Sequence, residues 1–481
     1  MWMTIPFVLN SLLNFVVSLL VAKFLGPAEY GRFILALSAA VVVQTVLFDW
    51  LRLSATRFYS ERDRRERPQL RATLDAAFLV VATLAAAAGA IELSFGFDAG
   101  LPAELAAAAL FVAIANGLFD FASALMRARF LDKSYGALVI AKNLLSFALT
   151  VGGAFVFASA RVAFLGMIVS ILGSLLLARR DLADPGAPPT RAESALAKAF
   201  LAYGLPIVVA NAIYQTVPLL NRLIVSRTLG FADAGQMSLA FEIGVRIVGA
   251  LGAALDVILF QLAVLAEKES GAEAGRASIG RNMGVVFALV LPAVAGCWLI
   301  LPSFEALFAP ESFKGPFGRY FELSLPALLA FALTNYAINP AFQLAHRLTP
   351  LIIGALVAVL ANVLAIGLLP ETGDASKYAL AQSISNGAGV LALIALLFTL
   401  EPMRPRARDI VGALIATAAM IGAGFPLRAL HPGAATLLLQ IIAGGAVYAA
   451  LAVALNVIDA RSLLWPKLRA RLRRGSRTAA E

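Results

Sequence analysis

Charged side chains interrupt several of the long apolar runs in this sequence. A charge at the centre of a membrane helix costs roughly 2.5–3.5 kcal/mol on insertion scales, so each such side chain must face protein or water. We assign four basic residues to the membrane spans rather than to the connections between them: Arg52, Lys142, Arg222 and Arg246. Guanidinium and ammonium groups held in this way could line a polar path for an anionic headgroup.

One apolar run carries a polar stripe. Asn211, Gln215 and Arg222 are separated by steps of four and seven residues, which places them on one face of a helix. Pro206 and Pro218 in the same run predict a kink or a break that frees backbone groups beside the path. The predicted substrate-binding residues are Arg52, Lys142, Asn211, Gln215, Arg222 and Arg246.

Acidic side chains in the same runs have two readings. Asp256 could be a protonatable carboxylate that couples transport to an ion, or a structural partner of Arg52. Helical spacing also allows Asp49 to neutralise Arg52 and Glu242 to neutralise Arg246. Both readings stay open, and the candidates for ion coupling are Asp49, Asp120, Glu242 and Asp256.

The sequence offers no catalytic or metal-binding set. Cys297, His346 and His431 do not have the spacing of metal ligands or of a nucleophile with its base. No GxSxG, P-loop or HExxH pattern occurs. We therefore expect a protein that is not an enzyme, with no catalytic residue, no bound metal and no cofactor beyond H⁺ or Na⁺ coupling.

The composition predicts a polytopic membrane protein. Apolar and aromatic residues make up 60% of the 481 residues and charged residues only 14%, against about 25% charged residues in soluble proteins. Because an apolar helix of about 20 residues spans a bilayer, the runs predict an all-α protein with about fourteen spans. They are 3–24, 31–53, 73–95, 103–126, 135–159, 162–179, 201–225, 235–265, 281–302, 320–345, 350–369, 377–400, 408–428 and 433–457.

The basic residues predict the orientation. Connections after even-numbered spans, together with the tail, hold 27 of the 39 lysines and arginines, and the opposite connections hold eight. The positive-inside rule then places both termini in the cytoplasm of a bacterial inner membrane. The net charge of +10 therefore indicates a cytoplasmic membrane face rather than nucleic-acid binding.

A short motif recurs 204 residues apart. Leu25-Gly26-Pro27-Ala28-Glu29-Tyr30-Gly31 matches Leu229-Gly230-Phe231-Ala232-Asp233-Ala234-Gly235. The offset covers six predicted spans, so both copies keep one membrane orientation, which is typical of transporters with two parallel lobes. We expect an N-lobe (1–182), a cytoplasmic linker (183–200), a C-lobe (201–400), spans thirteen and fourteen (401–458) and a basic cytoplasmic tail (459–481).

These motifs resemble a known family. The turn from Phe24 to Gly31, Tyr203-Gly204-Leu205-Pro206, Asn221-Arg222 and the second turn from Leu229 to Gly235 look like those of Wzx-type polysaccharide or O-antigen flippases. The resemblance places the chain in the multidrug/oligosaccharidyl-lipid/polysaccharide flippase superfamily and covers roughly residues 1–400. The sequence looks less like the peptidoglycan lipid II flippases.

The resemblance implies a two-lobed bundle that works by alternating access. It implies that the chain moves undecaprenyl-pyrophosphate-linked oligosaccharide from the cytoplasmic to the periplasmic leaflet during synthesis of O-antigen, capsule or exopolysaccharide. The implied partners are the lipid-linked oligosaccharide, the bilayer, a polysaccharide polymerase and glycosyltransferases. A multidrug exporter of the same superfamily, a membrane-embedded glycan polymerase or ligase, and a scaffold for glycosyltransferases remain the alternatives.

Overall fold

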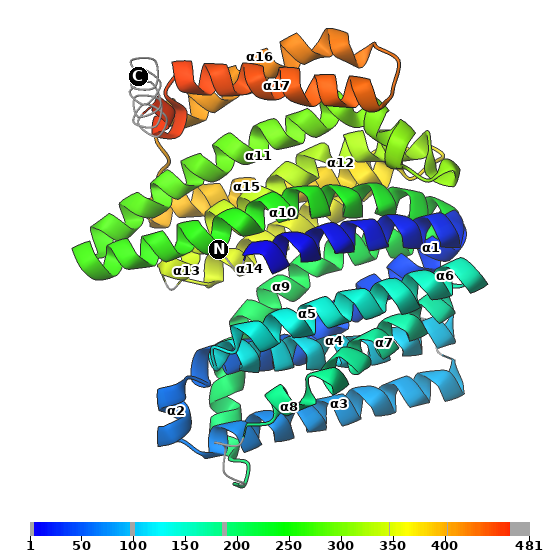
Figure 1. The fold of residues 1–481 in the computed structure, drawn as a ribbon, viewed down its shortest axis with the longest axis vertical. Helices are drawn as coiled ribbons and strands as arrows, with labels where there is room; N and C mark the ends of the chain where they lie inside the picture. Colours follow the sequence, from blue (N-terminus) through cyan, green and yellow to red (C-terminus); the bar gives the residue numbers. More distant parts are fainter. Residues whose placement is uncertain (1–3, 97–101, 185–189, 346, 402, 462–481) are drawn as a thin grey trace, which may run out of the picture. The chain divides into compact units, whose positions relative to one another are not determined.

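The chain is an all-α polytopic membrane protein (Figure 1). The computed structural model describes residues 4–96, 102–184, 190–345, 347–401 and 403–461, which form helices and no strand. The helices are α1 (Thr4–Phe58), α2 (Glu61–Glu66), α3 (Gln69–Phe95), α4 (Ala103–Ala128), α5 (Asp132–Ser146), α6 (Gly152–Phe157), α7 (Ala160–Leu177), α8 (Arg179–Leu182), α9 (Ser194–Thr228), α10 (Phe231–Ser270), α11 (Ala272–Phe308), α12 (Pro316–Leu333), α13 (Asn339–Leu344), α14 (Thr349–Leu368), α15 (Ser376–Leu400), α16 (Ala407–Arg428) and α17 (Ala434–Ala454). Short π or 3-10 turns occupy Phe147–Val151, Glu311–Phe313, Thr334–Ile338 and Val457–Asp459.

The number of spans agrees with the prediction once α1 is counted as two. Among the described residues, 13 helical segments are long and apolar enough to cross a membrane. The first of them, Leu13–Phe58, has 46 residues and would be about 70 Å long if straight, more than twice the apolar core of a bilayer. It contains part of the first predicted span and all of the second, so the 13 segments account for the fourteen predicted spans.

Glycine makes the reversals at both copies of the repeated motif. Gly26 interrupts α1 with a φ of 70° and a ψ of 171°, and Pro27 follows it. Gly230, at the equivalent position, has a φ of 101° and separates α9 from α10. Only glycine adopts such angles without strain, so glycine is required at both positions.

The proline-rich seventh span is less disturbed than expected. Helix α9 continues from Ser194 to Thr228 with both Pro206 and Pro218 inside it. Of the predicted kink or break, the break is therefore excluded, and a kink at either proline stays a prediction. The helix begins inside the segment predicted as linker, and its last turn contains Arg227.

The contacts divide the chain into two compact units. The first unit comprises residues 1–246, 310–320 and 351–385, and the second comprises the remainder. The division does not follow the two lobes inferred from the repeat, which stay a prediction.

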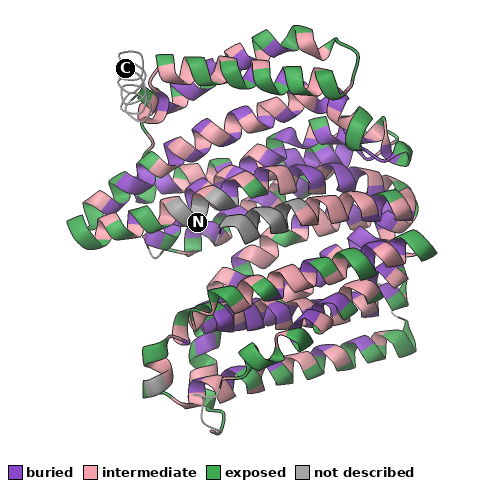
Figure 2. Cartoon of the chain, viewed as in Figure 1, coloured by how far each residue is buried: buried purple, intermediate pink, exposed green. Residues whose placement is uncertain are grey.

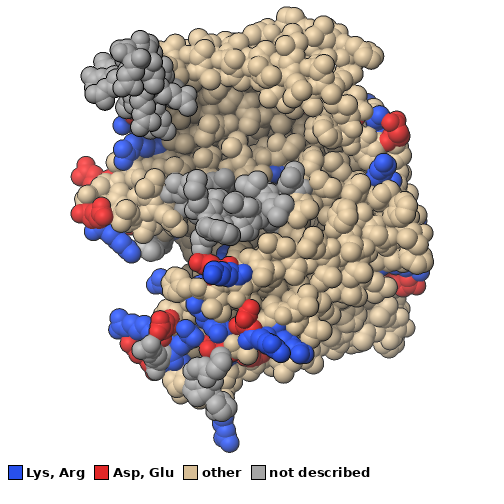
Figure 3. Space-filling model, in the orientation of Figure 1, with Lys and Arg blue, Asp and Glu red and all other residues tan. Residues whose placement is uncertain are grey.

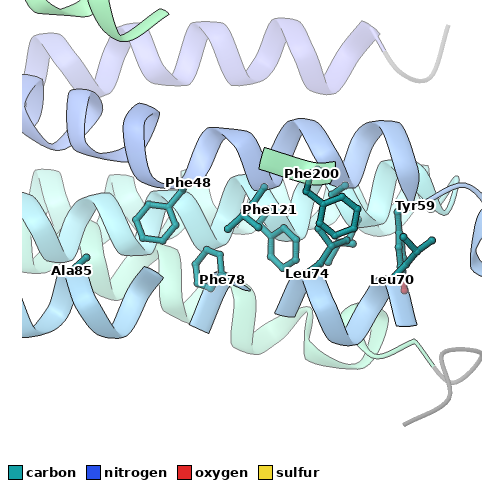
Figure 4. Packing of buried hydrophobic residues seen from close by; sticks show 12 residues of the cluster. Phe48, Tyr59, Leu70, Leu74, Phe78, Ala85, Phe121 and Phe200 are labelled. Atoms are coloured by element: carbon teal, nitrogen blue, oxygen red, sulfur yellow. The ribbon is translucent and has the colours of Figure 1, made fainter. Parts of the chain in front are cut away.

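Aromatic side chains from four helices form a core of the first unit (Figure 4). Phe78 of α3 stacks on Phe121 of α4, with ring centroids 5.4 Å apart, and Phe48 of α1 lies 5.1 Å from Phe78. Phe200 of α9 joins the same cluster. A Cβ atom on Gly117 of α4 would collide with the ring of Phe48. Small residues therefore let these helices approach closely. Close packing is needed because, within lipid, the hydrophobic effect does not drive helices together.

Burial separates the inner from the outer helices of this unit. In Figure 2, α4 is largely buried, whereas α3 is exposed along much of its length. The exposed side chains of α3 include Leu79, Val80 and Leu84. In a bilayer, an exposed apolar face of this kind contacts lipid.

In the second unit, α16 and α17 pack together against α11. Gly424 of α16 sits against Leu299 of α11, and the hydroxyl of Tyr448 on α17 donates to the backbone oxygen of Ala288. Most of α17 is exposed and apolar. Figure 3 shows tan surface along the helices, while charged side chains gather near helix ends, over α2 and near the turn between α10 and α11.

Candidate functional site

The two copies of the repeated motif touch each other in the first unit. A Cβ atom on Gly31 would overlap the backbone oxygen of Phe231, and a Cβ atom on Gly235 would overlap the backbone oxygen of Pro27. Gly31 and Gly235 occupy equivalent positions in the motif, as do Pro27 and Phe231. The contact is thus reciprocal, and it places the second half of α1 against the start of α10, backbone to backbone.

Arg222 links three helices next to this crossing. Its Nη2 donates to Oε1 of Glu242 on α10 at 2.7 Å, and its Nη1 donates to the hydroxyl of Ser38 on α1. The side chain is only 6% exposed. The sequence offered no partner for Arg222 within a helical turn, and the structure supplies one from the neighbouring helix.

Arg246 lies one helical turn beyond Glu242 on α10. The carboxylate of Glu242 is within electrostatic range of both Arg222 and Arg246. The Nε atom of Arg246 is buried and has no hydrogen-bond partner among the described residues. Glu242 was expected to neutralise Arg246 on its own helix. It instead accepts a hydrogen bond from Arg222 and interacts electrostatically with both arginines.

A second group of charges continues from Arg246 towards α4. Lys142 of α5 lies within electrostatic range of Arg246 and of Asp120 on α4, and its Nζ sits 4.5 Å from the ring centroid of Phe119. Asp120 accepts a hydrogen bond from Nε2 of Gln44 at 2.7 Å. Cations stack favourably on aromatic faces, so Phe119 and Asp120 together hold the lysine within the helix bundle.

Arg52 joins this group through Asp120, which lies within electrostatic range of it. Arg52 also donates through Nε to Oδ1 of Asp49 at 3.2 Å, as the three-residue spacing predicted. The side chain of Arg52 is 31% exposed and that of Asp49 is 12% exposed. All four embedded cations thus lie in the first unit. Asp120 attracts Arg52 and Lys142, and Glu242 attracts Arg222 and Arg246, while Lys142 and Arg246 repel each other.

The remaining predicted site residues differ in their surroundings. Asn211 is half-buried and Gln215 is exposed, although both share a helical face with the buried Arg222. The side chain of Asp256 lies outside the described residues. Among those that the structure describes, no three His, Cys, Asp or Glu side chains are grouped so that they could hold a metal ion.

The sequence analysis did not identify Ser38 or Gln44 as site residues. The repeat nevertheless points to Ser38, because it relates this position to a candidate site residue. Adding the offset of 204 to Ser38 gives Glu242. The two partners of Arg222 therefore come from equivalent positions in the two copies. Gln44 carries no such signal, since a glutamine in an apolar run shows its partner only when the helices are packed.

Comparison with known proteins places the fold. The chain is similar to the lipid II flippase MurJ in an inward closed conformation, with a TM-score of 0.69 and 15% identity over 96% of this chain and 99% of that one. It is also similar to an inward-facing multidrug resistance MATE family transporter of the MOP superfamily, with a TM-score of 0.56 and 14% identity over 85% and 95% of the two chains.

A third similar structure is a MOP superfamily transporter from Pyrococcus furiosus, described as having a binding pocket of reverse polarity that suggests a different function. Its TM-score is 0.53, with 17% identity over 87% of this chain and 95% of that one. No protein-family model and no curated protein matches the chain. The chain therefore has the MOP fold. The sequence looked less like the lipid II flippases, but the fold does not separate the chain from them, since MurJ matches over nearly its whole length.

Proposed function

We propose that this chain is a flippase that carries undecaprenyl-pyrophosphate-linked oligosaccharide from the cytoplasmic to the periplasmic leaflet by alternating access. The observation that carries the proposal is the presence of four embedded cations from α1, α5, α9 and α10 in one unit of a MOP fold. The similarity to a lipid II flippase supports it, because that protein handles a lipid-linked substrate.

The charge balance of the site suits an anion. Arg52, Lys142, Arg222 and Arg246 face three described carboxylates, those of Asp49, Asp120 and Glu242. A pyrophosphate would supply the missing negative charge and accept several hydrogen bonds from planar guanidinium groups, which match phosphate geometry. The lipid tail would stay in the bilayer while the headgroup crosses.

A multidrug exporter is the second candidate, since the MATE transporter shares the fold. The excess of cations disfavours it, because a site for cationic drugs needs an excess of acids.

We propose no enzymatic activity, since the headgroup crosses without covalent chemistry. A polymerase and glycosyltransferases would supply and consume the substrate, at the inner membrane of a bacterium. Coupling to H⁺ or Na⁺ would use the carboxylates already named.

Deletion in the native host tests the substrate. We expect lipid-linked sugar to accumulate in the cytoplasmic leaflet and surface polysaccharide to fall, as measured by lipid extraction and leaflet-selective labelling. Unchanged surface polysaccharide and unchanged lipid intermediates would rule the proposal out. Export of cationic dyes that depends on the chain would favour the exporter instead.

Complementation with Arg246→Gln tests the site. Arg246 offers an unpartnered Nε, so its loss removes charge without breaking a hydrogen bond of that atom. We expect export to fall at least about tenfold, which corresponds to about 1.4 kcal/mol, at unchanged protein level. Arg161→Gln is the matched control, because Arg161 pairs with Glu104 in an exposed position. Full export in Arg246→Gln would defeat the assignment.

A further inference from the structure

Glu242 occupies the place where an anion would meet the arginines of the first unit. Its carboxylate accepts from Arg222 and lies within electrostatic range of Arg246. The side chain of Glu242 is 24% exposed, whereas that of Arg222 is 6% exposed. A ligand that approaches Arg222 therefore meets the carboxylate of Glu242 first.

We infer that Glu242 is an internal competitor of the anionic ligand, and that the ligand binds Arg222 and Arg246 only when Glu242 releases them. The inference rests on the proposed function in one respect, namely that the first unit binds an anion. The inference goes beyond the proposed function because it names one carboxylate, that of Glu242, as the group that sets the affinity for the anion and the pH dependence of that affinity.

The charge of Arg222 is already shared with one anion. Its Nη1 donates to Ser38 and its Nη2 donates to Glu242. The guanidinium has further N–H donors, so a second anion is opposed by the charge of Glu242 rather than by a lack of donors. Two anions at one pair of guanidinium groups repel each other strongly away from bulk water. Binding must therefore exchange one anion for the other.

The exchange involves a proton. When the ligand takes the hydrogen bond from Arg222, the carboxylate of Glu242 loses its counter-ion next to a second anion. It then takes one proton from the solvent and becomes a neutral acid. The titratable and charged groups near it are Arg222 from α9, Arg246 from its own helix and Tyr30 from α1. Lys142 of α5 extends the set through Arg246. Binding of the anion thus carries uptake of one proton.

Sulfate binding to the purified full-length chain in lipid nanodiscs tests the inference. Sulfate does not titrate between about pH 6 and pH 8, so any pH dependence belongs to the protein. Linkage of one proton makes the wild-type affinity rise by up to about tenfold for each unit by which the pH falls. Calorimetry in two buffers of different ionisation enthalpy reports the proton uptake directly.

The variant Glu242→Gln should behave differently. Glutamine keeps an oxygen that accepts from Arg222 but carries no charge. We expect at least about tenfold tighter sulfate binding than wild type near pH 8, with no proton uptake and a flat pH profile. If this variant does not fold, Glu242→Ser provides the same test, because it introduces the residue found at the equivalent repeat position, Ser38. Glu104→Gln is the control, since it neutralises a carboxylate of an exposed pair with Arg161.

Unchanged or weaker sulfate binding in both Glu242 variants would overturn the inference, as would a wild-type affinity that does not depend on pH. Absence of sulfate binding in every variant would also overturn it. These outcomes are separate from the proposed function. If the chain shows the expected exchange with sulfate but does not move lipid-linked sugar, the inference about Glu242 stands and the proposed flippase function is wrong.

Discussion

At the scale of single residues, the four embedded cations are not equivalent. Arg52 and Arg222 are each hydrogen-bonded to an acid, at 3.2 Å and 2.7 Å. Lys142 rests on an aromatic ring, and Arg246 keeps a buried Nε without a partner among the described residues. Arg52 and Arg222 are therefore bonded directly to a carboxylate, whereas Arg246 has a donor that no described residue occupies.

Asp184 shows how a residue outside the membrane anchors the segment between the predicted lobes. Its Oδ2 accepts from the hydroxyl of Tyr59 at 2.7 Å and from Nη1 of Arg64 at 2.8 Å, while Nε of Arg129 lies 3.7 Å away. Although burial raises the pKa of this carboxyl, Tyr59, Arg129 and Arg64 lower it further, so the net pKa lies below its usual range. The carboxylate thus ties the residues after α8 to α2 and to the ends of α1 and α4.

Replacing Asp184 should loosen this segment. In Asp184→Asn, we expect trypsin to cut at the exposed Arg191 several times faster than in wild type, as followed by gel electrophoresis. Because the folded pKa is lowered, the anchor is fully formed above about pH 4, the usual carboxyl range, and is lost as the pH falls through the folded value. The ratio of the cleavage rates of Asp184→Asn and wild type should therefore not change between about pH 6 and pH 8.

The control for this experiment is Asp181→Asn, since Asp181 is exposed nearby on α8. Its cleavage rate should equal that of wild type. Equal rates in Asp184→Asn and wild type would show that other contacts hold the segment. One such contact is the hydrogen bond from Glu193 N to the hydroxyl of Thr73.

At the scale of helices, the crossing of α1 and α10 depends on the absence of two side chains. Gly31 and Gly235 allow backbone contact between the two copies of the motif. The aromatic ring of Tyr30 packs edge-on against Phe313 beside it, and the guanidinium of Arg32 lies 5.0 Å from the ring centroid of Phe231. The crossing thus has a close centre surrounded by aromatic contacts.

A methyl group at Gly31 should force these helices apart. Gly31→Ala places its Cβ atom on the backbone oxygen of Phe231, which cannot move as a flexible side chain can. We expect a destabilisation of about 1–3 kcal/mol, as overpacking commonly costs, measured as a lower thermal midpoint in detergent.

Gly136→Ala is the matched control, because Gly136 lies inside α5 with open space around its Cβ position. Alanine is the better helix former by about 1 kcal/mol, so this variant should melt at the wild-type temperature or slightly above it. A Gly31→Ala variant that melts with the control would show that the crossing is not tightly packed.

At the scale of the whole molecule, the sequence predicted the spans well and the cross-helix contacts poorly. Long apolar runs predicted the helices, since a helix pairs its own backbone groups inside a bilayer. The pair of Asp49 and Arg52 was visible because both lie on one helical turn. The pair of Arg222 and Glu242 was not, because it joins α9 to α10 and depends on how the two helices pack.

The orientation predicted from the basic residues can be tested directly. Because the fourteen spans are even in number, reporters fused after residue 481 and inserted at Arg191 should both report the cytoplasm. A reporter inserted at Gly315 should report the opposite side. Alkaline phosphatase and green fluorescent protein fusions distinguish the two sides. A C-terminal fusion active as phosphatase would contradict an even number of spans with a cytoplasmic N-terminus.

The reciprocal contact of the two motif copies has a consequence for how such a chain can arise. Two copies that meet reciprocally at equivalent positions have the geometry of a two-fold homodimer whose subunits have been fused. In a true homodimer, a carboxylate at the position of Glu242 would face its own copy, and the two would repel. After fusion the two copies can differ in sequence. Serine therefore occupies position 38 and glutamate position 242, and Arg222 donates hydrogen bonds to both. The asymmetry at this contact is accessible only to a single chain.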